Sequence, residues 1–492
     1  MKEALDALSR RALAVPVAAV RPYLLLKLTL VLLAVDMWLT RASHAGRYGA
    51  GGFNVAHWAW LDAAQPPIEP AYYVGACVLT SALCLAIAFA DRPPRWLLAL
   101  ACLVHTWSWA MSMLDSYQHH YLLSIVLAAM VFFPPLRADE ALRASEAPAA
   151  APAAKPAKRK KRKKPAPDAP PPRASGHPFV RAWSYTLLCA SIAIVYAYTA
   201  FSKADPEWLA GAALRQVMQY PADGVVPGPG ANVAIRTFHG IIEGLGEHGA
   251  LFWFVMGHSV VVVQIVVCAG YLLAPWRDAA RSRVTQAFFF VALGTALSFH
   301  VGAELMGLEI GWFSYYMVGY ALIAMLPGGL LVRVARAMFW LVLDLRRERD
   351  ALPPWAPLAL AGVAALALVS AGWTADLPGA REASVLAAVL LGAGVVAALL
   401  RAGDARAITG YAVGALLAAL GFALCVQLSE LRWDYWRNVG GDHRRRGEVE
   451  QAYAAYVKAN RYAPDGQDRR RQEDEMRAIL EQRGLLPRRG GR

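Results

Sequence analysis

The hydrophobic residues of this chain are gathered into long blocks, and short polar segments separate them. Runs of about 17 to 25 predominantly apolar residues recur along the sequence, which is the length that a helix needs to cross a bilayer. They begin near Leu24, Tyr72, Trp96, Tyr121, Ala182, Ala250, Ala287, Ile310, Ala356, Ala383 and Ala407. The pattern predicts an all-α integral membrane protein, a polytopic bundle of roughly eleven transmembrane helices with a small soluble helical C-terminal tail.

Composition supports this prediction and excludes several alternatives. Apolar residues make up 57% of the 492 residues and charged residues 17%, whereas soluble domains carry about 25% charged residues. All six cysteines lie inside apolar runs, without a CxxC pair or a Cys/His cluster, so neither disulfides nor a metal site are predicted. The sequence contains no Walker loop, so no nucleotide cofactor is predicted. The first run is long and lacks a cleavage site, so it is interpreted as a retained helix.

Much of the formal net charge of +14 lies in a linker, residues 138–178, and in the C-terminal tail. The linker is rich in Ala, Pro and Lys and contains the block KPAKRKKRKK at residues 155–164. Such a segment repels itself and cannot form a core, so it is predicted to be disordered. It is either a solvated tether or a docking segment for anionic lipid headgroups of the bilayer. Since the membrane surface accounts for the charge, no nucleic-acid partner is predicted.

The basic segments also orient the helices, because short loops rich in Lys and Arg stay in the cytoplasm. If each of the first eight runs crosses once, the cytoplasmic segments are the N-terminus, the linker and residues 91–95 and 275–283. The loops on the opposite face are residues 41–71, 115–120 and 202–249. The expected localisation is the inner (plasma) membrane of a bacterium, with these loops on the periplasmic side.

The runs and linkers divide the chain into six segments. Residue 328 begins an amphipathic stretch with charged ends, which is interfacial or spanning; if it spans, the orientation of everything after it is reversed. The predicted segments are residues 1–137 with the first four helices, the linker 138–178, residues 179–327 with the next four helices, the amphipathic segment 328–350, residues 351–428 with three further helices, and the tail 429–492.

The tail contains GEVEQAYAAYVKANRYAPDG at residues 447–466. Ala452, Tyr456, Ala459 and Pro464 resemble the second helix of a single tetratricopeptide repeat, in which small residues let paired helices approach closely. One repeat cannot bury its own face. The tail is therefore either a generic helical hairpin or a repeat that binds a protein partner.

One lysine stands out in the segment YAYTAFSKADPEWLAG at residues 196–211. The chain has ten lysines, six of them at residues 155–164, and Lys203 is the only one between that block and Lys458. Arginine would anchor a helix equally well, but its pKa above 12 excludes it as a base. Lys203 is thus either an interfacial anchor or a titratable amine. Nearby Asp205 and Glu207 favour the anchor, unless they point to water while the amine points inward.

Other polar residues share the predicted face of Lys203. His119 and His120 lie in a short loop between two runs, His300 lies at the end of the seventh run, and Trp208 follows Lys203 closely. Each histidine taken singly is an ordinary polar residue. Together, a desolvated amine, imidazoles and an indole would form a pocket that accepts a proton from a phenol or a quinol.

Three segments of the chain resemble the horizontally transferred transmembrane domain (HTTM) family, whose best-known members are the vitamin K-dependent gamma-carboxylases. FSKADPEWLAG resembles the carboxylase segment in which a lysine precedes an acidic turn, then Trp and Gly, with the same spacing from Lys203 to Trp208. QHHYLL resembles Asn-His-Ser-Tyr-Leu and assigns the functional histidine of the family to His119. FHVGAELMGLEIGWF resembles a segment ending in Ile-Gly-x-Phe and assigns His300. The likeness covers residues 21–327.

The resemblance implies a reduced quinone, similar to vitamin K hydroquinone, as the cofactor. Lys203 is then its base, His119 and His300 are hydrogen-bonding or proton-relay groups, and Trp208 contributes to cofactor binding. In the carboxylases the oxidised quinol yields a strong base that removes a glutamate γ proton before carbon dioxide adds. Three apolar runs and a charged tail follow residue 327 in place of the large luminal region of the carboxylases. This difference favours quinol deprotonation or oxidation over carboxylation of protein glutamates.

A second hypothesis has no catalytic residue. The chain is then a membrane scaffold or a small-molecule transporter whose tail binds a partner, and Lys203 is an anchor. The two hypotheses differ for Lys203→Arg, since both cations extend equally well to the interface but only lysine titrates usefully.

Overall fold

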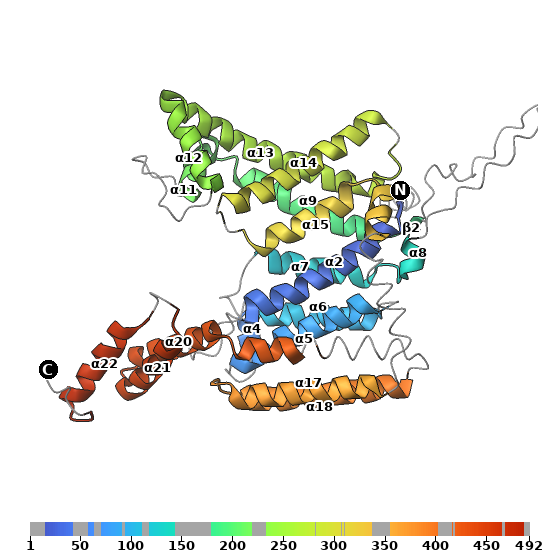
Figure 1. Ribbon diagram of the computed structural model, residues 1–492. Helices are drawn as coiled ribbons and strands as arrows, with labels where there is room; N and C mark the ends of the chain where they lie inside the picture. The colour runs from blue at the N-terminus through green and yellow to red at the C-terminus, as the bar shows by residue number, and fades with distance from the viewer. Residues whose placement is uncertain are drawn as a thin grey trace, which may run out of the picture. The chain divides into compact units, whose positions relative to one another are not determined.

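The computed structural model shows a predominantly helical chain that forms two compact units. Unit 1 comprises Met1–Leu26 and Phe132–Val342, and unit 2 comprises Lys27–Val131 and Leu343–Arg492. The helices are shown in Figure 1. The structure describes residues 15–42, 58–62, 70–90, 94–110, 118–142, 179–218, 233–280, 282–306, 308, 310–336, 355–401, 416, 419–464 and 468–486.

Unit 1 is built mainly from apolar helices. Helix α9 packs against α13, and α14 packs against both α13 and α15. Its elements are β1 (Pro16–Ala18), the first residues of α2 (Val20–Asp36), α8 (Ala138–Leu142), β2 (Phe179–Arg181), α9 (Trp183–Ser202), α10 (Pro206–Leu209), α11 (Ala212–Val217), α12 (Val233–Leu245), η4 (Gly246–His248), α13 (Gly249–Leu273), η5 (Ala274–Trp276), α14 (Arg283–Leu305) and α15 (Trp312–Met325).

Unit 2 contains the rest of α2, a group of apolar helices and the tail. Helix α6 packs between α5 and α7, α17 and α18 form a hairpin, and α21 packs between α20 and α22. Its elements after α2 are η1 (Met37–Arg41), α4 (Ala59–Asp62), α5 (Pro70–Phe89), α6 (Arg95–Ala110), α7 (Gln118–Val131), α17 (Ala356–Thr374), α18 (Ala380–Arg401), α20 (Ser429–Arg445), α21 (Val449–Tyr462) and α22 (Arg470–Gln482).

The prediction of a helical membrane protein is confirmed at this level. Within the described residues, four helices are long and apolar enough to cross a membrane, or five if α15 and the helix Gly328–Arg336 form one broken span. The roughly eleven spans remain a prediction. Several apolar runs produce shorter helices, such as α6 and α7 with 16 and 14 residues, which are below the roughly 20 residues that a simple span needs.

The structure differs locally from the sequence prediction at the chain's polar segments. Residues 138–142 were expected to begin the disordered linker, but they form α8, because Ala141 and Leu142 are buried against Leu331 and Val332. A three-residue antiparallel pair, β1 with β2, adds a small ribbon to the predicted all-helical fold. Most of the linker, residues 143–178, and of the amphipathic segment, residues 337–350, lies outside the described residues.

The loop predicted at residues 202–249 is partly helical, and the segment α12 to α13 folds back on itself. The ring centroids of Phe238 and Trp253 are 6.0 Å apart, whereas 15 residues of straight helix would separate them by about 22 Å. The reversal occurs at η4, where Gly246 has a φ of 48°. Helix α13 alone, with 25 residues, is therefore long enough to cross the hydrocarbon core of about 30 Å.

Two buried arginines bind the backbone carbonyls at the C-terminal end of α15, where the helix is interrupted. The Arg21 guanidinium donates from Nε and Nη2 to the two carboxylate oxygens of Asp278, each at 2.7 Å, and also to the carbonyls of Ile323, Ala324 and Leu326. Arg277 donates to the carbonyl of Met325 at 2.7 Å. The last carbonyls of a helix have no partner within it, and in unit 1 these side chains provide one. The clamp thus satisfies the end of α15 at its 120° bend.

Candidate functional site

Local sequence places Lys203 at a sharp corner in unit 1. Helix α9 ends at Ser202 with Lys203 as its C-cap. Asp205 caps the next helix, since its carboxylate accepts from the backbone N–H groups of Glu207 and Trp208 at 2.8 and 3.0 Å. Pro206 occupies the first turn of α10, where a missing N–H is tolerated. The sequence SKADPEW therefore encodes a helix end, a cap and a new helix within a few residues.

The Lys203 amine faces the indole of Trp208. Its Nζ lies 5.2 Å from the ring centroid, which is within the range of a cation–π contact. Lys203 is half-buried, and desolvation by burial lowers the pKa of its amine because the charged form loses water.

The acidic neighbours of Lys203 do not neutralise it. Among the described residues, no carboxylate forms an ion pair with Lys203. The Asp205 carboxylate is occupied by the α10 cap, and Glu207 is exposed to solvent. This is the arrangement that a lowered amine pKa requires, and the sequence had left it open.

Two glycines let the Trp208 turn approach α13. A Cβ on Gly257 would lie 2.2 Å from the backbone oxygen of Trp208, and one on Gly211, whose φ is 79°, would lie 2.2 Å from that of Trp253. Trp208 also packs against the buried cluster of Leu214 and Trp253. The indole beside Lys203 is thus positioned by backbone contact as well as by apolar packing.

Adding one methyl group at this contact is expected to disturb the turn. Gly257→Ala should lower the free energy of unfolding by about 1 to 3 kcal/mol, the usual cost of overpacking, and should displace Trp208 from Lys203. Gly294→Ala on α14 is the matched control, since nothing lies within 4 Å of its added Cβ. Thermal unfolding of the full chain in nanodiscs measures the difference. Equal stability of the two variants would contradict the close contact.

His300 belongs to a buried hydrogen-bonded group on α9, α14 and α15. Its Nε2 lies 2.6 Å from the Tyr196 hydroxyl, and its Nδ1 lies 3.3 Å from the Ser314 hydroxyl. The Tyr196 ring stacks on Tyr271, with centroids 5.8 Å apart. Since a neutral imidazole has one donor and one acceptor nitrogen, the chain from Tyr196 through His300 to Ser314 can shift a proton in either direction by a change of tautomer.

Tyr196 connects this chain to the segment that carries Lys203. It precedes Lys203 by seven residues on α9, which is two helical turns and therefore the same face. Within the described part of unit 1, no hydrogen bond joins Lys203 itself to Tyr196 or His300. The structure therefore pairs Lys203, at the end of α9, with Trp208 on α10, and it pairs Tyr196 on α9 with His300 on α14.

His119 lies in unit 2, so its predicted convergence with Lys203 and His300 remains a prediction. It was expected in a loop, but it forms part of the first turn of α7. The His119 and His120 ring centroids are 4.1 Å apart, and those of His120 and His105 are 6.2 Å apart. His105 and His120 are buried. The positively charged Arg41 interacts electrostatically with both His119 and His120. Unit 2 thus holds a histidine cluster of its own.

Sequence reasoning missed three members of these groups. Tyr196 could have been identified from the sequence, because it lies seven residues, or about two helical turns, before Lys203 and therefore on the same face of the helix. His105 had no local signal, because its neighbour His120 lies fifteen positions further along the sequence. Ser314 had no local signal at all, since only the pairing of α14 with α15 brings it to His300. His57, in the first predicted loop, lies outside the described residues.

The described residues contain no group of three or more His, Cys, Asp or Glu side chains that could hold a metal ion. Comparison of the chain with protein-family models, with curated proteins and with solved structures finds no match.

Proposed function

We propose that this chain is an integral membrane protein that binds a reduced quinone of the vitamin K class beside Trp208 and deprotonates it with Lys203. The observation that carries the proposal is the half-buried Lys203 amine, which faces an indole and has no carboxylate partner among the described residues. A purely structural anchor would extend its charge into water or pair it with an acid.

The residues around Lys203 suit an aromatic, apolar ligand. Trp208 offers a ring for stacking, and the cluster behind it includes Phe238 and Phe252. Large apolar side chains such as Phe201 are exposed on the same helix end, where a lipid-soluble molecule would arrive from the bilayer. These features support the class of ligand, and the resemblance of FSKADPEWLAG to the carboxylases supports the quinol.

The chemistry assigned to the chain is a proton transfer. A bound quinol supplies an acidic phenolic hydroxyl and, after deprotonation, two electrons. Lys203 Nζ is neutral in a larger fraction of molecules than an exposed lysine, so it accepts the phenolic proton and becomes an ammonium that the Trp208 face stabilises. The hydrogen-bonded chain of Tyr196, His300 and Ser314 begins on α9, the helix that ends at Lys203, and continues on α14 and α15. It is assigned a hydrogen-bonding or relay role. The relay role of His119 is proposed from sequence alone.

The proposal is tested with the full chain in nanodiscs, supplied with a reduced naphthoquinone in air-saturated buffer. Loss of quinol is followed by fluorescence, and the chain is expected to consume it faster than empty nanodiscs do. Binding is measured separately, in the absence of oxygen, as quenching of tryptophan fluorescence that weakens in Trp208→Phe. No saturable binding and no excess consumption would favour the noncatalytic scaffold or transporter.

A further inference from the structure

The C-terminal tail contains a polar cavity that the proposed quinol chemistry does not use. Helices α20, α21 and α22 pack around a small core that includes Val449, Tyr456 and Met476. The cavity lies between these helices and has a volume of about 270 Å³. It is lined by Arg437, Asn438, Arg444, Tyr456, Arg469 and Gln472.

Two of the three arginines are held in place by carboxylates of the tail itself. Arg437 donates from Nε and Nη2 to Asp434, at 3.0 and 2.6 Å, and its guanidinium lies over the Trp433 ring. Arg444 donates from Nη2 to Glu475 at 3.0 Å. A guanidinium has five N–H donors, so these contacts orient both groups and still leave donors for a ligand.

Arg469 gives the cavity its excess positive charge. Within the described tail, no carboxylate lies at ion-pair distance from its guanidinium, although its backbone N–H donates to Asn460 at 2.6 Å. Three guanidinium groups thus face the cavity, and two carboxylates balance them. The cavity is suited to an additional anion.

The neutral lining residues add hydrogen-bond donors. Asn438 and Gln472 carry amides, and Tyr456 carries a phenol. Gly440 lets the Tyr456 ring lie against α20, because a Cβ there would be 2.9 Å from the ring. Planar guanidinium groups combined with such donors match the several oxygens of a phosphate group. The volume of about 270 Å³ lies just below the range of roughly 300 to 1,000 Å³ that is typical of ligand pockets, which favours a compact headgroup over a long chain.

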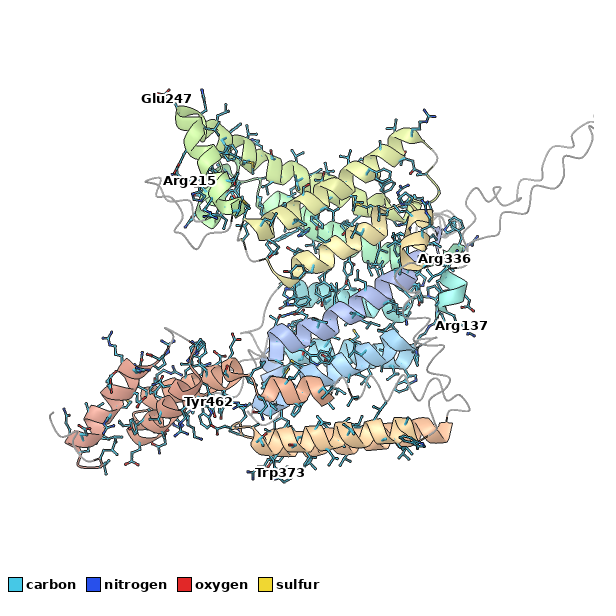
Figure 2. All side chains as sticks on the ribbon, in the orientation of Figure 1. Arg137, Arg215, Glu247, Arg336, Trp373 and Tyr462 are labelled. Atoms are coloured by element: carbon cyan, nitrogen blue, oxygen red, sulfur yellow. The ribbon has the colours of Figure 1, made fainter. Side chains whose placement is uncertain are left out.

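The tail is docked onto the turn of the α17–α18 hairpin, which places this cavity near the predicted membrane surface. Asp376 in that turn accepts from the Tyr462 hydroxyl at 3.2 Å and pairs with Lys458 at 3.5 Å, while Trp436 donates to its backbone carbonyl at 3.1 Å. Figure 2 shows Tyr462 on the tail and Trp373 at the adjacent end of the hairpin.

We propose that the cavity lined by Arg437, Arg444 and Arg469 is a binding site for a phosphate monoester group. The site is separate from Lys203 and does not depend on the proposed function. Its ligand is either a soluble phosphate ester or the headgroup of a phosphatidate-type lipid, and the two sources share the same recognition chemistry.

The test uses the full chain in nanodiscs of neutral phosphatidylcholine and measures binding of glycerol 3-phosphate by calorimetry. Arg469→Gln is expected to weaken binding at least tenfold. Arg471→Gln, which removes the same charge from an exposed position of α22 outside the cavity, is the matched control and should change binding less than twofold. Tyr456→Phe tests the lining again without a change of charge and should weaken binding.

The lipid source is tested in a second arm. Nanodiscs that contain phosphatidate should compete with glycerol 3-phosphate in the wild type, and the competition should be lost in Arg469→Gln if the headgroup is the ligand. Competition that is absent in both proteins assigns the site to a soluble ester. No saturable binding of glycerol 3-phosphate, or equal weakening by Arg469→Gln and Arg471→Gln, would overturn the proposal. Displacement by an unphosphorylated acidic peptide as strong as by the ester would also overturn it.

Discussion

Lys203→Arg is expected to lower the rate of quinol consumption by at least about a hundredfold, which is the lower range for loss of a general base. Arginine keeps the positive charge, the reach to the interface and the cation–π contact with Trp208. It removes only the titration, because its pKa above 12 leaves almost no neutral form near neutral pH. The variant therefore separates a base from an anchor better than a substitution by alanine.

The pH dependence follows from the lowered pKa of Lys203. The neutral amine is the active form, so the rate should rise with pH through this lowered pKa and level off above it. The rise should occur at a lower pH than the ordinary value of about 10.4 for an exposed lysine. In Lys203→Arg the residual rate should lack this rise.

Lys458→Arg is the matched control, because it makes the same exchange in the tail, at a position that contacts Asp376 and Trp436. It should retain the wild-type rate. Full activity in Lys203→Arg, with a normal thermal unfolding profile, would exclude the base and leave Lys203 as an interfacial anchor of a noncatalytic protein.

The largest loss of stability is expected from the Arg21 clamp. Arg21→Met should lower the free energy of unfolding by about 3 to 5 kcal/mol, since it leaves the buried Asp278 charge unpaired. The carbonyls of Ile323 and Leu326 also lose a donor. Arg283→Met, at an exposed position of α14, is the control and should change stability little. Chemical unfolding of the full chain in detergent micelles measures both.

A double variant distinguishes pairing from packing. Arg21→Met combined with Asp278→Leu leaves no buried charge, so it should be more stable than Arg21→Met alone, by a coupling energy that a double-mutant cycle reports. Strict additivity of the two substitutions would contradict a direct ion pair.

Asp278 also gives this clamp a dependence on acid. Burial raises the pKa of its carboxyl, but the charge and hydrogen bonds of Arg21 and two backbone N–H groups hold that pKa below its usual value. A lowered folded-state pKa contributes stability that is complete above the unfolded value of about 3.9 and is lost as the pH falls through the folded value. Asp278→Asn should lack this acid-dependent component.

Local sequence features predicted those parts of the fold that depend on interactions between residues close together in the sequence. Long apolar runs predicted membrane helices because each backbone polar group in a bilayer must be satisfied within its own helix. The segment after Lys203 was expected to form an acidic turn, and in the structure Asp205 of that turn caps α10 through contacts within three positions. Helix α8 was missed, since Ala141 and Leu142 are apolar enough to be buried only when Val332 is present as a partner.

The same distinction between local sequence and tertiary packing applies to the candidate site. The amino-acid sequence by itself determined that Lys203 is rare, that it ends an apolar helix and that an acidic turn with Trp208 follows. Only the tertiary structure decided that no carboxylate among the described residues forms an ion pair with Lys203, that Tyr196 and Ser314 flank His300, and that Arg21 closes the end of α15. These contacts join residues up to 305 positions apart, and their partners are selected by which helices pack together, a choice that no local pattern encodes.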